Sequence, residues 1–227
     1  MKRLLYIGIS CILFNLQSCF RYTTIVDERG DNLELYDYYV DEYGNEGIVV
    51  YINLLETRVL VLSSDEQELP WGQPGQLLFD SLTSISSESN NGLLMLNIMY
   101  NHGINHYPAQ SWCMSKNNGG FPYTGSWRLP SHYEWKNFVC RSENVVNQIN
   151  KSLARIGGVP LDKNDYYWTC TEDYENYWKF SDFETDYDPV NCAINESPLI
   201  LALVNKENWH KQRKHKVRAI KYVYYKD

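Results

Sequence analysis

The order of strand-like and helix-like segments along the chain predicts an α+β fold with an antiparallel sheet. Runs rich in β-branched residues occupy 48–62, helical periodicity covers 93–156, and strand-like runs return from 166 onward. Blocks of strands and helices that follow one another are typical of α+β proteins, whereas doubly wound nucleotide-binding folds alternate them. A chain of 227 residues can bury its own core without metals or dense disulfides.

The first residues are typical of an export signal and not of the fold. An apolar run from Leu4 to Leu16 follows two basic residues, and as a helix it would span about 20 Å. This is too short for the roughly 30 Å hydrocarbon core of a bilayer. The next residues, Leu16-Gln17-Ser18-Cys19, resemble the bacterial lipobox. We therefore expect a lipoprotein signal peptide at 1–18 and a lipid on Cys19, with an ordinary secretory signal as the alternative.

A lipid on Cys19 would place the protein in the cell envelope, anchored to a bacterial membrane, on the periplasmic or surface face of an outer membrane. Diacylation supplies the two chains that stable anchoring needs. Residues 19–45 are acidic and rich in tyrosine, and we expect a tether or leader there, which could hold one strand around Leu33 to Val40. The folded domain is expected at 46–227.

The first part of this domain has the pattern of a β-hairpin. Ile48 to Ile52 and Val59 to Leu62 are β-branched and apolar, and Asn53 to Arg58 lies between them as a turn. Residues 64–91 contain prolines, glycines and a serine cluster, so they are expected to form a long surface loop.

Helices and further strands follow from the spacing of apolar residues. Ser131 and Glu134 have the spacing of a capping box, which predicts a helix that begins there and carries Trp135 inward. The other helices are expected at 93–103, 108–116 and 144–156, and the later strands at 167–171, 199–204 and 217–225.

Three motifs, taken in order, resemble one domain family. They are Trp127-Arg128-Leu129-Pro130-Ser131 after a Gly-Gly pair, Tyr167-Trp168-Thr169-Cys170-Thr171-Glu172, and Val217-Arg218-Ala219-Ile220. Together they are similar to the Lcl C-terminal domain family of bacterial exported proteins, over about residues 46–224. The resemblance implies a C-type-lectin-like fold, in which antiparallel strands pack with two or more helices and a long loop. It also implies structural roles for Trp127, Arg128, Leu129, Pro130, Trp168 and Arg218.

The chain departs from this pattern in two places. Family members often have a cysteine in the last strand, where this chain has Ala219, so a bridge to Cys113 by that route does not carry over. The Glu-Pro-Asn, Gln-Pro-Asp and Trp-Asn-Asp motifs of calcium-dependent lectins are missing. The resemblance therefore implies no calcium-mediated sugar chelation.

The segment 173–195 is where we expect ligand binding. It interleaves acidic and aromatic residues, and it corresponds to the long loop through which lectin-like folds contact ligands. Tyr and Trp can stack on sugar rings, and carboxylates can accept hydrogen bonds from hydroxyls or hold calcium. The alternative is a loop whose aromatic residues pack on the domain. The candidate binding residues are Asp173, Tyr174, Tyr177, Trp178, Asp186, Tyr187 and Asp188.

Composition narrows the possible function classes. A net charge of -7 argues against a general nucleic-acid binder, and aromatic residues make up 15% of the chain. Apart from Cys11 in the signal and the expected lipidation site Cys19, four cysteines remain. They form no C-x-x-C pair, so a structural zinc site is not expected. They could form two disulfides in three ways or stay buried as free thiols. The four are Cys113, Cys140, Cys170 and Cys192.

These observations predict a non-catalytic, adhesin-like binding protein that recognises a glycan or a cell-surface protein through the 173–195 segment. We expect no catalytic residue, no metal site and no cofactor, with calcium the one weak possibility. A structural subunit of a surface assembly is one alternative. A cysteine-dependent enzyme is another, because formylglycine-generating enzymes share a related fold, and Cys140 and Cys170 would then be the candidates.

Overall fold

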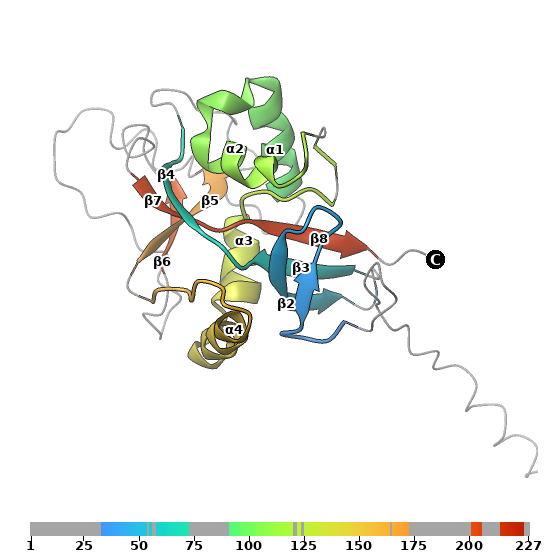
Figure 1. Cartoon of the computed structure of the whole chain (residues 1–227). Coiled ribbons are helices and arrows are strands. Elements are labelled where there is room, and N and C mark those ends of the chain that lie inside the picture. The colour runs from blue at the N-terminus through green and yellow to red at the C-terminus, as the bar shows by residue number, and fades with distance from the viewer. Residues whose placement is uncertain are drawn as a thin grey trace, which may run out of the picture.

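The fold is mixed α+β, as the sequence predicts, and its strands form two four-stranded sheets with helices packed around them (Figure 1). The computed structural model describes residues 33–53, 55, 58–72, 91–119, 122–123, 125–163, 165–172, 201–205 and 214–224. Every structural statement below concerns these residues.

The first sheet is antiparallel throughout, with the order β1-β2-β3-β8. The predicted hairpin is confirmed, because β2 and β3 pair from Gly47↔Ser63 to Asn53↔Arg58, with a bulge between Val49 and Tyr51. β8 then pairs with β3 and closes the sheet with a strand from the far end of the sequence. The strands are β1 (Tyr38–Val40), β2 (Glu46–Asn53), β3 (Arg58–Ser63) and β8 (Ile220–Tyr224).

Residues 33–45 pack as part of this body, although the sequence analysis assigned them to the leader. Leu33 and Tyr39 are buried in the core, and β1 pairs with β2. Asp41 is buried too, and it accepts hydrogen bonds from the backbone N–H groups of Tyr43 and Asn45. An acidic composition suggested solvation, but hydrogen bonds satisfy this carboxylate within the fold.

The second sheet has the order β4-β7-β5-β6 and mixes the two directions of pairing. β4 and β7 are antiparallel, whereas β5 is parallel to both β6 and β7. The expectation of antiparallel pairing alone is therefore wrong for this sheet. Residues 173–200 lie between β5 and β6, which is enough chain for the crossover that parallel strands need. The strands are β4 (Gln67–Pro70), β5 (Tyr166–Glu172), β6 (Leu201–Asn205) and β7 (Lys214–Val217).

Two sequence expectations are corrected at the junction of the sheets. The strand predicted at 217–225 is interrupted at Arg218 and Ala219, where the chain leaves β7 in the second sheet and enters β8 in the first. The expected surface loop at 64–91 contains β4. Trp71 in this stretch is fully buried, and its indole N–H donates to the carbonyl oxygen of Thr169 (2.9 Å). Residues 73–90 of that loop lie outside the described part of the chain.

The predicted helices are confirmed. Ser131 forms both halves of the capping box with Glu134, and α3 continues into a π-helical turn, η2. α4 buries Val145, Ile149 and Leu153, the residues that carried its periodicity. The helices are α1 (Asn91–Asn101), α2 (Pro108–Ser115), α3 (His132–Glu134) and α4 (Glu143–Arg155), with the 3-10 turn η1 (Ile104–His106) and the π-helical turn η2 (Trp135–Val139).

The helices cover both faces of the sheets and create two core clusters. In β5, Trp168 and Cys170 belong to the cluster that contains α1 and α2 residues, whereas Tyr167 belongs to the one that contains η2 and α4 residues. β3 alternates in the same way, with Val61 in the first cluster and Leu62 in the second. Figure 1 shows α1 and α2 on one side of the strands and α4 on the other. Burial on both faces explains why β3 is apolar without interruption from Val59 to Leu62.

Gly92, in the first turn of α1, should be irreplaceable. A Cβ built on Gly92 would overlap Nη1 of Arg128 and come within 3.1 Å of Oε2 of Glu134, both buried. Gly to Ala normally stabilises a helix by about 1 kcal/mol, but here we expect Gly92→Ala to lower the midpoint of urea unfolding. Asn97→Ala, at an exposed position of the same helix, is the control and should leave it nearly unchanged. A more stable Gly92→Ala protein would contradict this packing.

Candidate functional site

The centre of the fold is a buried ion pair between Arg128 and Glu134. Arg128 Nη2 lies 2.5 Å from Glu134 Oε1, and Nη1 lies 2.8 Å from Oε2, so the guanidinium and the carboxylate meet in a bidentate fork. The side chains are 2% and 0% exposed. Burial opposes the charge on Arg128, but the Glu134 carboxylate outweighs it and raises the pKa of the guanidinium.

This pair connects four parts of the chain. The backbone of Arg128 exchanges two 2.9 Å hydrogen bonds with Ile220, the first residue of β8. Glu134 Oε2 also accepts from the N–H and the hydroxyl of Ser131, which begins α3. Gly92 brings α1 against the same groups. The hydrogen-bond partners of Arg128 and Glu134 named here all belong to the fold itself. We therefore assign the ion pair to the scaffold and not to a binding site.

The other motif residues occupy similar places. Trp127 is buried and its indole N–H donates to Asp41 (2.7 Å), while the Trp168 indole donates to the Leu69 carbonyl. Leu129 is buried, and the carbonyl of Pro130 accepts from the N–H of Cys170 in β5 (2.8 Å). These contacts are those of a scaffold.

Arg218 is the centre of a second polar network, at the junction of the two sheets. Its Nη2 lies 2.6 Å from Glu66, and its Nη1 donates to the carbonyls of Ser63 and Ser64. Glu66 also accepts from the hydroxyl of Tyr167 and pairs with Lys216 (3.1 Å). The guanidinium is fully buried.

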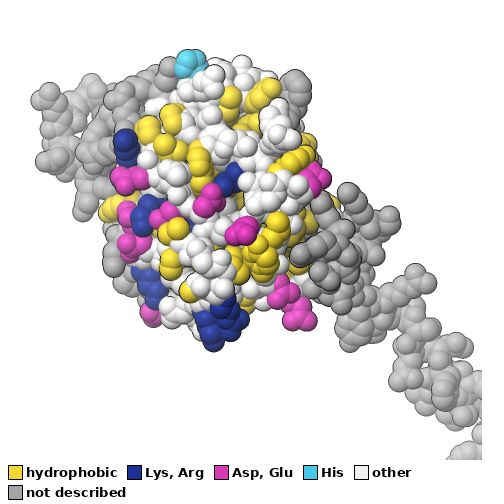
Figure 2. All heavy atoms as spheres, in the orientation of Figure 1, with side chains coloured by type: hydrophobic (Ala, Val, Ile, Leu, Met, Phe, Trp, Pro, Cys, Tyr) yellow, Lys and Arg dark blue, Asp and Glu magenta, His cyan; other side chains and the backbone are white. Residues whose placement is uncertain are grey.

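Two lysines near the C-terminus, Lys216 and Lys221, also pair with carboxylates of the same body. Lys216 lies within 4 Å of Glu66, Asp162 and Asp165, and Lys221 is 3.6 Å from Asp41. Figure 2 shows basic and acidic side chains interspersed toward the second sheet and α4. On that face, the described residues present no single patch of positive charge.

The described cysteines have no environment suited to a nucleophile. Cys113, Cys140 and Cys170 are free and buried. Burial raises the pKa of all three thiols, that of Cys170 to about 12, so the thiolate form that reacts is suppressed. Cys192 lies outside the described residues.

The described residues contain neither a cluster of metal-binding side chains nor a membrane-spanning helix. No group of three or more His, Cys, Asp or Glu side chains in this part of the chain could hold a metal ion. No described helix is both long and apolar enough to span a bilayer.

The predicted ligand-binding segment is anchored at both ends by adjacent strands of the second sheet. It leaves β5 after Glu172 and enters β6 at Leu201, which pairs with Tyr166 at the start of β5. The segment therefore joins the two ends of β5, at the edge of the sheet where β6 lies. The candidates Asp173, Tyr174, Tyr177, Trp178, Asp186, Tyr187 and Asp188, and the predicted lipidation site Cys19, lie outside the described residues.

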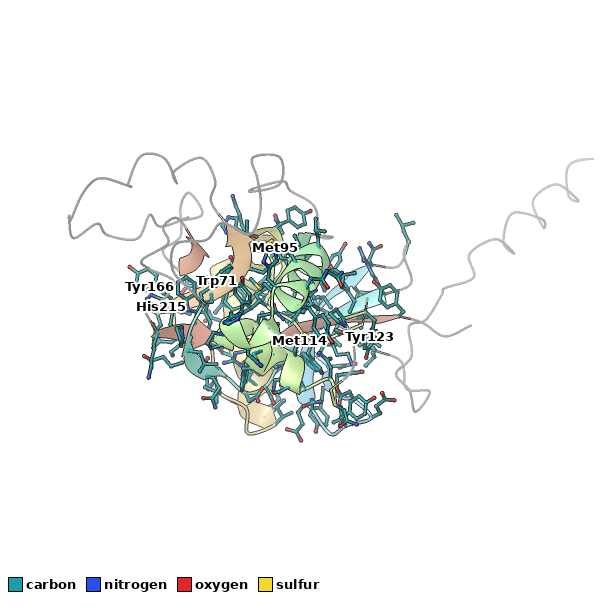
Figure 3. The ribbon with its side chains drawn as sticks, turned by 90° about the horizontal axis from the view of Figure 1, so that it is seen from above. Trp71, Met95, Met114, Tyr123, Tyr166 and His215 are labelled. Atoms are coloured by element: carbon teal, nitrogen blue, oxygen red, sulfur yellow. The ribbon has the colours of Figure 1, made fainter. Side chains whose placement is uncertain are left out.

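An aromatic cluster stands where the segment returns, and the sequence analysis did not identify it. The His215 ring lies edge-on between Tyr166 and Trp168, with centroid distances of 5.6 and 4.9 Å. Figure 3 shows Tyr166 and His215 side by side at the end of the molecule opposite Tyr123. Alternation along β5 places Tyr166 and Trp168 on one face, and that signal was available. No signal in the sequence indicated the position of His215, because its strand pairs with distant residues such as Leu69.

Comparisons with known proteins add no identification, since no family model, no curated protein and no solved structure matches this chain. What the described residues establish is the class of body that carries the segment. It is a mixed α+β domain with two buried arginine networks and an acidic, aromatic segment joining two neighbouring strands.

Glu134→Gln should strongly destabilise the protein, because it leaves the Arg128 cation buried without a counter-charge. Breaking a buried pair in this way costs about 3–5 kcal/mol, which should appear as a large drop in the urea midpoint. Glu143→Gln is the matched control, because Glu143 is 61% exposed and pairs with Lys163 at the surface. Equal midpoints for the two variants would contradict the central role of the Arg128–Glu134 pair.

The buried thiols should not react in the native protein. In a Cys192→Ser background we expect negligible labelling by an aromatic disulfide reagent at pH 8, and labelling of Cys113, Cys140 and Cys170 once urea unfolds the chain. Quantifying the released chromophore checks this. Rapid labelling of a thiol in the native protein would contradict this prediction and support the alternative of a cysteine-dependent enzyme.

Proposed function

We propose that this protein is an exported, lipid-anchored binding protein with a C-type-lectin-like architecture, and that it acts without catalysis. Its ligand is a glycan or a cell-surface protein, bound through residues 173–195. The lipobox that ends at Cys19 supports the anchor, and the aromatic and acidic composition of the segment supports the binding role.

The observation that carries the proposal is the attachment of this segment to a well-packed sheet. β5 is buried between both core clusters, through Tyr167 on one face and Trp168 on the other. β6 pairs with β5 from Tyr166↔Leu201 to Glu172↔Asn205. A segment that joins two paired strands has fixed ends, which lowers the entropy that ligand binding must overcome. Function carried by a loop on a rigid frame is a common arrangement.

The chemistry of the segment favours hydroxyl-rich ligands. Trp178 and Tyr187 can stack on the apolar faces of sugar rings, and neighbouring carboxylates such as Asp186 and Asp188 can accept hydrogen bonds from hydroxyls. The Tyr166–His215–Trp168 cluster lies beside the point where the segment rejoins the sheet. Tyr166 and His215 are half-buried, so they carry the aromatic character of the segment to the described surface, whereas Trp168 is buried beneath them.

The topology supports the lectin-like architecture. Strands from both ends of the folded body, β1 and β8, share the first sheet, and the long segment leaves from the second. A long loop between strands is a feature that the resemblance implies. The alternative of a cysteine-dependent enzyme gains no support, because Cys140 and Cys170 are buried and their pKa values are raised.

A glycan array and a cell-binding assay with residues 20–227 would test the proposal. Trp178→Ala and Tyr187→Ala should each weaken binding about tenfold, the effect of losing about 1.4 kcal/mol at an aromatic anchor. Tyr123→Ala, an exposed tyrosine outside the segment, is the matched control and should bind like the unmodified chain. The proposal fails if nothing binds, or if all three variants bind equally.

A further inference from the structure

One end of the first sheet carries apolar side chains that the core does not use. We call it the hairpin end and define it by Leu35, Leu55, Arg58 and Tyr224. Leu55, in the turn between β2 and β3, is 97% exposed, Leu35 is 42% exposed and Tyr224 is 38% exposed. A leucine that protrudes almost completely from a hairpin turn gains nothing from the fold. Exposed apolar groups that gather in one place usually mark an interaction surface.

Strand pairing brings Leu55, Arg58 and Tyr224 together. Arg58 pairs with Asn53 in β2 and with Tyr224 in β8, so Leu55 projects from the turn beside the end of β8. Arg58 Nη1 lies 3.5 Å from the Tyr224 hydroxyl, and its guanidinium lies 4.2 Å above the Tyr222 ring. The hairpin end therefore combines a protruding aliphatic group, a tyrosine and a guanidinium.

The chain enters the fold at this same end. β1 runs antiparallel to β2, and a turn at 34–37 precedes it, in which the Asp37 N–H donates to the Glu34 carbonyl and the Tyr36 N–H donates to the Val49 carbonyl in β2. Figure 1 shows the first described residues and the ends of β2 and β8 on one side, and β4 to β7 on the other. Figure 2 shows hydrophobic side chains over the first sheet.

The tether that the proposed function requires keeps this end close to the lipid. From Cys19 to Leu33, the chain spans roughly 50 Å when fully extended and about 20 Å as a flexible coil. A domain of this size is about 40 Å across. A coil of that length would be shorter than the domain is wide, so a lipid on Cys19 would hold the side on which the chain enters near the membrane.

We propose that the hairpin end contacts the bilayer that holds the lipid anchor, with Leu55 inserted among the headgroups and Tyr224 and Arg58 at their level. This inference rests on the lipid anchor of the proposed function. Tyrosine prefers the membrane–water interface because its ring is apolar and its hydroxyl polar. The chain has a net charge of -7, so attraction to anionic lipid does not explain the contact. The second sheet then points away from the membrane.

The experiment uses the lipidated chain from Cys19 onward, reconstituted in phosphatidylcholine vesicles. Leu55→Cys in a Cys192→Ser background provides one thiol for an environment-sensitive fluorophore, because Cys113, Cys140 and Cys170 are buried. Val159→Cys is the matched control. Val159 is an exposed aliphatic residue (43%), and its N–H donates to the carbonyl of Ser64, just past the opposite end of β3. Each position is compared with itself, with and without vesicles.

The expected result is blue-shifted emission and several-fold weaker quenching by iodide at residue 55, with neither change at residue 159. Quenching at residue 55 that vesicles leave unchanged, in a lipidated and vesicle-bound chain, overturns the orientation and leaves the anchor intact. Shielding of residue 55 that grows with protein concentration without vesicles identifies a second copy as the occupant and also overturns it.

The anchor has its own readout, so the two failures are distinguishable. Cys19→Ala should leave the chain in the supernatant when vesicles are pelleted, whereas the unmodified chain should pellet with them. A chain that carries no lipid, or a Cys19→Ala chain that still pellets, overturns the anchor of the proposed function and, with it, the tether argument.

Discussion

The fold depends on an ion pair placed where no water reaches. The bidentate fork between Arg128 and Glu134 joins α3 to the Trp127–Ser131 segment, and the backbone of Arg128 joins that segment to β8. Transfer of both charges from water opposes folding, and buried pairs often add little net stability. What this pair adds is geometry, since a planar guanidinium accepts one orientation of its partner. Its removal would affect every element that contacts it.

A second arginine solves a related problem at the junction of the sheets. The chain must leave β7 and enter β8 within two residues, and the carbonyls of Ser63, Ser64 and Val159 are exposed to that turn. Arg218 donates to all three and balances its charge with Glu66. Two apolar clusters on opposite faces are thus held in register by polar contacts at the sheet junction.

The local features of the fold could be predicted from the sequence, and the long-range ones could not. The Ser131–Glu134 capping box and the periodicity of Val145, Ile149 and Leu153 depend on neighbours within one helix, so spacing alone identified them. Glu66 gave no signal, because its partners Arg218 and Lys216 are distant in the sequence. The break between β7 and β8 at Arg218 could not be predicted for the same reason. The exposure of Leu55 could not be predicted from its place in the turn between two strands.

The pairing of buried charges within the fold constrains where function can reside. Arg218 and Lys216 are paired with carboxylates of the same body, and the described thiols are buried. A body whose described polar groups serve its own folding has its reactive surface at its edges. The two edges differ in character. One presents an aliphatic tip beside the entry of the chain, and the other holds the aromatic cluster around His215. That division suits a domain held at one side and exposed to a ligand on the other.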